Sequence, residues 1–196
     1  MTEKKSASAG KKRIIVAITG ASGINYALAL LKTLNEKNVE VHLIISEWAG
    51  EVLKEETGKN ISVLKKYAKK TYSNKDLAAS ISSSSFLVDG MIILPASIKT
   101  VSEILHSHTS SLITRCADNM LKTKNKLVIG VRETPLSGPT LENLWKLSVY
   151  GAIIFPLSPG FYHKPKKIAD LESFIVGKAL DLLGVSNNEF IRWKAK

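Results

Sequence analysis

Apolar and polar residues alternate along this chain in blocks, and the blocks predict buried strands separated by helices. The first block, Arg13–Ile18, is a run rich in β-branched residues, which is typical of a strand buried on both faces. A turn of small residues, Thr19–Gly23, follows it, and helical spacing then runs over Ile24–Lys37 before a second apolar run at Val39–Ile45. We expect this strand, turn, helix and strand to form a right-handed crossover between parallel strands.

The same alternation continues to the end of the chain. Further strands are predicted at Met91–Leu94, Lys126–Val131 and Ala152–Phe155, and helices at Trp48–Thr57, Ile98–His106, Leu112–Lys122, Leu141–Tyr150 and Ile168–Leu183. A length of 196 residues suits one domain with a single sizeable core. The predicted fold class is therefore α/β: a single-domain, three-layer, doubly wound and mostly parallel sheet of Rossmann-like or flavodoxin-like type. We expect residues 1–12 to form a flexible basic tail and residues 13–196 to form the α/β domain.

Four loops follow predicted strands and carry small, hydroxyl or charged residues: Thr19–Gly23, Ser82–Ser85, Pro95–Thr100 and Arg132–Pro135. In open α/β sheets, ligands bind in the crevice outside the carboxyl ends of the strands. The turn Thr19–Gly23 lets backbone amides approach a ligand at the start of a helix, which favours a nucleotide or a flavin over a plain tight turn. It lacks the full G-x-G-x-x-G spacing, and Ile45–Ser46 provides no acidic residue for a ribose, which argues against a nicotinamide dehydrogenase.

Composition and charge argue against some classes of protein, such as membrane-spanning and nucleic-acid-binding proteins. A chain that is 44% hydrophobic and 23% charged, without an apolar run near the roughly 20 residues of a membrane span, is expected to be globular and cytoplasmic, with no membrane partner. The net charge of +11 allows nucleic acid, an anionic surface or anionic small substrates, but no basic stripe is interleaved with aromatic residues, so we expect no nucleic acid partner. Cys116 is expected in the core, and His106 with His108 lacks a third metal ligand.

Several motifs in one order resemble the UbiX-type flavin prenyltransferases from about Arg13 to Trp193. They are Thr19-Gly20-Ala21-Ser22-Gly23, Ile81-Ser82-Ser83, Pro95-x-Ser97-Ile98-Lys99-Thr100, Arg115-x-Ala117-Asp118 with Leu121-Lys122, Val131-Arg132-Glu133-Thr134-Pro135-Leu136, Pro159-x-Phe161-Tyr162 and Arg192-Trp193. Members of this family join a dimethylallyl group from a dimethylallyl phosphate to reduced FMN at N5 and C6. The prenylated FMN then serves a UbiD-type decarboxylase. The resemblance also implies a homododecamer with sites at subunit interfaces and no metal.

The resemblance assigns site residues by position. FMN contacts fall on Gly20, Ala21, Ser22, Ser46, Ser97, Ile98, Lys99, Thr100 and Arg132. The dimethylallyl phosphate site falls on Lys122, Arg132, Glu133, Tyr162 and Lys178, of which Tyr162 and Lys178 are expected from a neighbouring subunit. The catalytic set is Glu133, Ser22, Glu56, Tyr162 and Trp193.

The chemistry of a leaving phosphate agrees with these residue types. Cations and a Tyr hydroxyl stabilise negative charge that develops on oxygen, and the ring face of Trp193 stabilises an allylic cation by about 1 to 2 kcal/mol when desolvated. Glu133, and Ser22 with Glu56, are expected to move protons during ring closure.

Ala96, Ser84 and Lys178 depart from the family's usual Cys, Gly and Arg. Lys178 keeps the positive charge but cannot donate two parallel hydrogen bonds to a phosphate as Arg does. This difference affects whether the protein prefers dimethylallyl monophosphate or pyrophosphate.

Three other functions are compatible with parts of the sequence. An FMN-dependent decarboxylase is expected to show a catalytic His after the first helix and a Pro-x-Met-Asn segment, and neither stands at a matching place. A non-catalytic flavin-binding partner is the second alternative, and a nucleic-acid-binding module driven by charge is the third. The transferase accounts for most of the motifs.

Overall fold

The chain forms one sheet of six strands in the order β3-β2-β1-β4-β5-β6. The computed structural model describes residues 11–193, so residues 1–10 of the predicted tail and residues 194–196 lie outside the described residues. The strands are β1 (Arg13–Ile18), β2 (Glu40–Ile45), β3 (Lys70–Ser73), β4 (Gly90–Ala96), β5 (Leu127–Val131) and β6 (Ile153–Pro156). The helices are α1 (Ile24–Glu36), α2 (Glu47–Thr57), α3 (Ser62–Lys65), α4 (Ile98–Leu105), α5 (Leu112–Lys122), α6 (Gly138–Val149) and α7 (Ile168–Leu183), with a 3-10 turn η1 (Ser80–Ser82).

Every pairing between neighbouring strands is parallel, which confirms the predicted doubly wound sheet and is stricter than the mostly parallel sheet we expected. The chain first builds outward from β1 to β3, then returns to place β4 on the other side of β1. Strand order therefore reverses between β1 and β4. This switch point is where a sheet of this order opens a crevice for a ligand.

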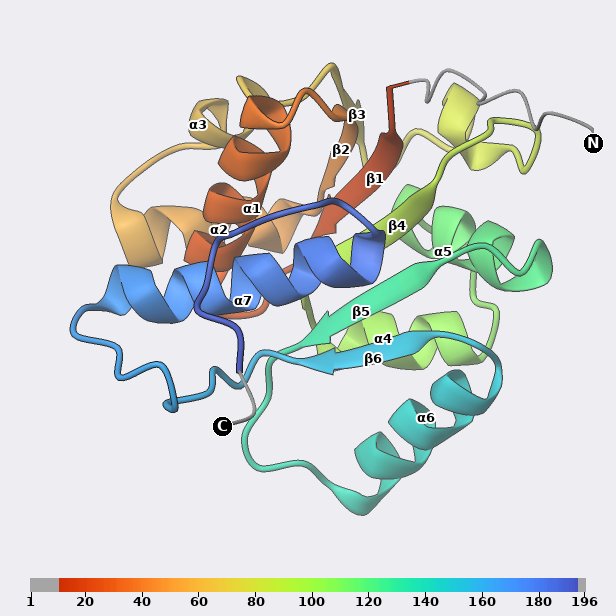
Figure 1. Cartoon of the computed structure of the whole chain (residues 1–196). Helices are drawn as coiled ribbons and strands as arrows, with labels where there is room; N and C mark the ends of the chain where they lie inside the picture. Colours follow the sequence, from red (N-terminus) through yellow and green to blue (C-terminus); the bar gives the residue numbers. More distant parts are fainter. Residues whose placement is uncertain (1–10, 194–196) are drawn as a thin grey trace, which may run out of the picture.

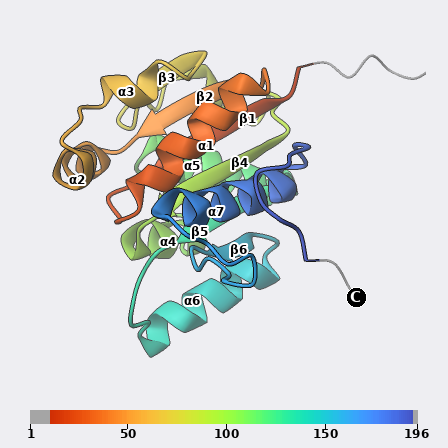
Figure 2. The same ribbon diagram turned by 60° about the vertical axis from the view of Figure 1, so that its left-hand side comes forward.

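Two apolar cores lie on opposite faces of the sheet because side chains alternate along each strand. In β1, Ile14 and Val16 belong to the core under α1, α2 and α7, whereas Ile15 and Ala17 belong to the core under α4, α5 and α6. Figures 1 and 2 show these two helical layers on either side of the sheet. Each large side chain that is fully buried there contributes roughly 1.5 to 3 kcal/mol.

The sequence pattern missed β3, an edge strand of four residues. Among Lys70–Ser73 only Tyr72 is buried, so no apolar run marks the strand. Tyr72 is instead held by a polar contact: its hydroxyl lies 2.8 Å from Nδ1 of the buried His42, whose Nε2 lies 3.0 Å from Oε1 of Glu40. The edge strand thus pairs with β2 through both its backbone and this hydrogen-bonded chain.

Thr19 ties the two strands of the switch point together immediately after β1. Its buried hydroxyl donates to the carbonyl of Pro95 at 2.9 Å and accepts the backbone N–H of Ser97 at 2.7 Å. Its own backbone N–H donates to the same Pro95 carbonyl at 3.2 Å. These bonds fix the turn after β1 against the turn after β4, from which α4 begins.

We expect Thr19→Val to lower the free energy of unfolding by about 1 to 3 kcal/mol, because Val keeps the shape but leaves the Ser97 N–H and the Pro95 carbonyl short of a partner. Urea unfolding followed by circular dichroism measures the change. Thr19→Ser is the matched control, since it keeps the hydroxyl and is expected to retain most of the stability. Equal losses in the two variants would contradict the assignment, because Thr19→Ser keeps the hydroxyl and therefore its hydrogen bonds.

Candidate functional site

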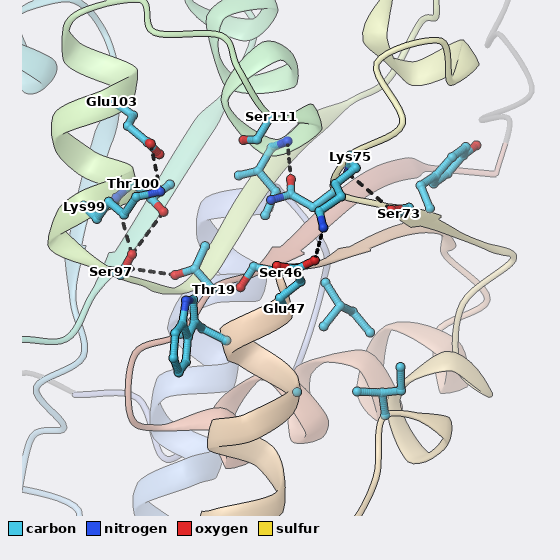
Figure 3. A pocket seen from close by; sticks show the side chains of 18 of the residues that line it. Thr19, Ser46, Glu47, Ser73, Lys75, Ser97, Lys99, Thr100, Glu103 and Ser111 are labelled. Atoms are coloured by element: carbon cyan, nitrogen blue, oxygen red, sulfur yellow. Dashed lines mark hydrogen bonds and ion pairs between the residues drawn. The ribbon is translucent and has the colours of Figure 1, made fainter.

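The carboxyl ends of β1, β2, β3 and β4 border an open cavity of about 750 Å³ (Figure 3). Most of the residues expected to contact FMN line it: Gly20, Ser46, Ser97, Lys99 and Thr100. Ala21, Ser22, Ile98 and Arg132 do not line the cavity. The structure therefore brings two of the four predicted loops, Thr19–Gly23 and Pro95–Thr100, to one site. Arg132–Pro135 does not line the cavity, and the prediction that Ser82–Ser85 lies at a strand's carboxyl end is wrong, because this loop leads into the amino end of β4.

The starts of α2, α4 and α5 all border this cavity. Their cap residues are Ser46, Ser97 and Ser111, each of which lines the cavity. Each cap hydroxyl accepts a hydrogen bond from the backbone N–H three residues later, at 3.2, 3.4 and 3.3 Å respectively. Because a helix start carries partial positive charge, several starts around one cavity favour an anionic ligand.

Two exposed ion pairs lie at the cavity. Lys99 pairs with Glu103 at 2.9 Å, and Lys75 pairs with Glu47. The lysine side chains are 81% and 78% exposed, so neither pair contributes much to stability. Both ammonium groups are therefore free to turn toward a bound anion at little cost.

The turn after β1 is shaped by two glycines. Gly23 adopts a φ of 98°, in the left-handed region that favours glycine, and a Cβ on Gly20 would lie 2.5 Å from Cβ of Trp48. The start of α1 is already occupied by an anion from the protein itself. The carboxylate of Glu56 accepts from the N–H of Gly23 at 3.0 Å and from that of Ile24 at 3.0 Å.

The sequence predicted that the start of α1 would face a ligand anion, but in the structure the carboxylate of Glu56 accepts its N–H groups. Glu56 was also expected to act with Ser22 in a proton relay. Its carboxylate is bonded to the backbone amide of Gly23, directly after the exposed Ser22, so the two residues do lie at the same turn.

Arg132 and Glu133 follow β5, next to the end of β4. Arg132 is half-buried, and its Nε is buried without a hydrogen-bond partner among residues 11–193. Glu133 is exposed and accepts the N–H of Thr134 at 3.0 Å, and no ion pair joins Arg132 to Glu133 in the described part of the chain. An unpartnered buried guanidinium nitrogen is costly and points to a missing anionic ligand.

Tyr162, Lys178 and Trp193 come together in an aromatic cluster around Phe174 and Phe190. The ring of Tyr162 lies 5.4 Å from that of Trp193, edge to face, and 5.8 Å from that of Phe174. Nζ of Lys178 lies 5.1 Å from the ring centre of Phe190 and 5.8 Å from that of Phe174. None of these residues lines the cavity, so one chain holds the flavin loops and this cluster apart.

The segment that carries Trp193 is fixed by a bidentate ion pair. The guanidinium of Arg192 donates to both carboxylate oxygens of Asp181 in α7, each at 2.7 Å. These hydrogen bonds hold the pKa of Asp181 below its ordinary value. The pair sets the position of the last described residues on α7.

Lys122 does not join Arg132 and Glu133 within one chain. It ends α5, which leads into the amino end of β5, whereas Arg132 follows the carboxyl end of β5. Five residues at 3.3 Å each put about 16 Å between the two ends of the strand. Lys122 pairs there with Asp118 at 3.1 Å. We expected it to lie with Arg132 in the same subunit, and the strand between them rules that out.

Cys116 is buried in α5 and donates to the carbonyl of Ile81 at 3.2 Å, which confirms the predicted core position. Burial raises the pKa of its thiol to about 12, so the thiolate that a nucleophile requires is absent near neutral pH. Within residues 11–193, no group of three His, Cys, Asp or Glu side chains is placed to hold a metal ion. No helix in that range is long and apolar enough to cross a membrane.

Sequence reasoning missed the side of the cavity above β3. Ser73, Asn74 and Lys75 line it, and Asn74 also holds α5 by accepting the N–H groups of Leu112 at 2.8 Å and of Ile113 at 3.0 Å. Because β3 carries no apolar run, the loop after it gave no sign of lying at a strand end. The one local signal was the pair Thr71-Tyr72, two residues that favour strands.

Comparisons with known proteins agree with this geometry. The Flavoprotein family model matches residues 2–179. The chain is 48% identical over 186 residues to the flavin prenyltransferase UbiX of Saccharolobus solfataricus, which covers 93% of this chain and 92% of that protein.

Two solved structures have the same fold over nearly the whole chain. One is AnUbiX (PadA1) in complex with FMN and dimethylallyl pyrophosphate, with 41% identity, a TM-score of 0.93 and coverage of 95% of this chain and 99% of that one. The other is a dodecameric FMN-dependent UbiX-like decarboxylase from Escherichia coli O157:H7, with 38% identity, a TM-score of 0.91 and coverage of 93% and 100%. The chain belongs to the flavoprotein family and, within it, to the UbiX-type flavin prenyltransferases.

Proposed function

We propose that this protein transfers a dimethylallyl group from a dimethylallyl phosphate to reduced FMN, at N5 and C6, and supplies the prenylated FMN to a UbiD-type decarboxylase. The observation that carries the proposal is the unpartnered Nε of Arg132 beside Glu133, at the same sheet edge as the hydroxyl-lined cavity. The relatives named flavin prenyltransferase, and the neighbour that holds FMN with dimethylallyl pyrophosphate, support the choice of both substrates.

The cavity fits reduced FMN as a substrate. The cap hydroxyls of Ser46 and Ser97 and the ammonium of Lys99 lie at helix starts, which suits a phosphate and a polyol chain. Gly20 lets the backbone of the first turn pass close to Trp48 in α2.

The donor requires a cationic phosphate site and an aromatic wall. When the allylic C–O bond breaks, the phosphate leaves with the electron pair, N5 forms the new bond to carbon, and N5 gives up its proton to the proposed relay of Ser22 and Glu56. Arg132, Lys122 and Lys178 would stabilise the leaving phosphate, and the rings of Tyr162 and Trp193 would face the allylic carbon.

Ring closure at C6 adds a proton to the alkene and removes one from C6, so the proton count is unchanged. Glu133 is exposed at the donor side and is the proposed acid and base there. Ser22, at the turn that Glu56 holds, is the proposed partner of N5.

The donor site requires more than one chain. Lys122 lies at the opposite edge of the sheet from Arg132, and Tyr162 with Lys178 is expected from a neighbouring subunit. We propose a homododecamer in which neighbouring subunits bring these residues to Arg132 and Glu133. An apolar stripe on α6 supports such contacts: Leu141, Trp145 and Val149 recur every four residues and are 53%, 63% and 64% exposed. The dodecameric neighbour supports the same number of subunits.

Anaerobic incubation with reduced FMN and a dimethylallyl phosphate tests the reaction, with mass analysis of the released flavin as the measurement. We expect FMN to gain one prenyl unit, and Glu133→Gln to slow this gain by about 10²- to 10⁴-fold because it removes the proposed acid and base. Glu142→Gln, on the exposed side of α6, is the control and is expected to react at the parent rate. FMN that binds but stays unmodified with both the monophosphate and the pyrophosphate would favour a decarboxylase or a flavin-binding partner instead.

Lys178 should limit affinity for the donor phosphate. Lys178→Arg is expected to lower the KM for the donor by about 3- to 10-fold, because a guanidinium binds phosphate through two parallel hydrogen bonds. Lys178→Gln should raise that KM, and Lys32→Arg on α1 should leave it unchanged. Steady-state kinetics with the monophosphate and the pyrophosphate in turn provide the values. If neither substitution at Lys178 changes the KM for the donor, Lys178 does not belong to the donor site.

The Asp181–Arg192 pair should hold Trp193 in place for turnover. Asp181→Asn is expected to reduce kcat with little effect on FMN binding, and Glu36→Gln on α1 is the control.

The same pair predicts a pH dependence. Because the pKa of Asp181 is lowered in the folded state, the pair stabilises the protein fully above the ordinary pKa of 3.8. This contribution is lost as pH falls through the lower folded-state pKa. In a Trp48→Phe, Trp145→Phe background, Trp193 fluorescence should therefore be flat above pH 4 and change only below it. A change centred near neutral pH would contradict this assignment.

A further inference from the structure

The cavity has two parts, and the proposed flavin residues account for only one. Gly20, Ser97, Lys99 and Thr100 lie over β1 and β4, and Ser46 lies between the two parts at the end of β2. The second part is formed by the end of β3, by α3 and by the start of α5. Figure 3 shows it on the side of Ser73, Lys75 and Ser111, facing Glu47.

The side chains of this second part suit a second nucleotide unit. Lys75 and Lys65 offer ammonium groups, and the starts of α2 and α5 add partial positive charge, so a phosphate is favoured. Glu47 offers a carboxylate, the group that accepts from ribose hydroxyls in sheets of this type. Ile61 and Ile113 supply apolar surface.

The Glu47–Lys75 pair crosses this part of the cavity and is easily opened. The two side chains are 74% and 78% exposed, so the pair is solvated on both sides. The sequence provides no acidic residue at the end of β2, but Glu47 stands in the first turn of α2 and reaches the same cavity. The carboxylate and the ammonium are thereby placed for a ribose and a phosphate, respectively.

The topology places this second part where a dinucleotide extends. A sheet of order 3-2-1-4-5-6 binds dinucleotides across the crevice at its switch point, with one half on each side. The volume of about 750 Å³ lies in the upper part of the range of about 300 to 1,000 Å³ for ligand sites. We infer that this cavity binds flavin adenine dinucleotide as well as FMN, with the adenylate half above β2 and β3. The inference rests on the proposed flavin site.

Binding of FMN and FAD to the full chain tests the inference, measured by quenching of flavin fluorescence at equal ionic strength. We expect FAD to bind with a Kd within about tenfold of that for FMN. Lys75→Gln should weaken FAD by about tenfold and FMN by less than about twofold, because only FAD brings a phosphate to this residue. Lys54→Gln, an exposed lysine of α2 outside the cavity, is the matched control and should change neither value.

Each contrary result has a distinct meaning. FMN that binds and is prenylated while FAD does not bind would overturn the second subsite and leave the proposed function intact. If Lys75→Gln weakens the binding of FAD and of FMN by the same factor, the second subsite is also overturned. Lys75 would then contact the FMN half that the two flavins share. If neither flavin binds, the proposed function fails together with this inference.

Discussion

The hydrogen bonds of Thr19 hold together the two turns on which the whole site depends. A parallel sheet leaves its carboxyl edge without pairing beyond the last residue of each strand, and at the switch point the neighbouring turns after β1 and β4 lead to opposite faces. Thr19 bridges that gap through one hydroxyl and one backbone amide, both directed at the turn after β4. The start of α4, with Ser97 as its cap, is thereby fixed to β1 rather than only to its own strand.

The site separates binding from chemistry in space. Helix starts and hydroxyl groups around the cavity suit an anionic, polar ligand, whereas the cations and rings proposed for the donor lie at β5, α5 and α7. The proposal of an active centre assembled from several copies rests on this separation. A single chain buries its two apolar cores but leaves Tyr162 and Trp193 exposed at 39% and 74%, which leaves both rings available to a neighbouring subunit.

The fold was readable from the sequence because every strand except the edge strand β3 carries an apolar run. The ends of α5 and α7 agree with the predicted bounds, since Ser111 and Gly184 are strong start and stop residues. The motif residues of the cavity were found for the same reason: they directly follow visible strands. The roles carried over for donor residues stay predictions.

The parts that could not be predicted depend on pairing across space. Tyr72 holds β3 through His42, and neither residue signals the other in the sequence. Glu56 reaches back 33 residues to the first turn, and nothing local in the sequence signals that contact. The conformational preferences of single residues do not reveal contacts between residues that are distant in the sequence.

The carboxylate of Glu56 at the start of α1 also changes which groups of a ligand this turn would accept. A phosphate brought to this turn would meet a negative charge where an ordinary nucleotide fold offers bare amides. The proposed flavin would therefore lie with its uncharged end toward this turn and its phosphate toward α2 and α4, whose starts line the cavity. The protein's own carboxylate would then set the direction in which the flavin lies across the sheet edge.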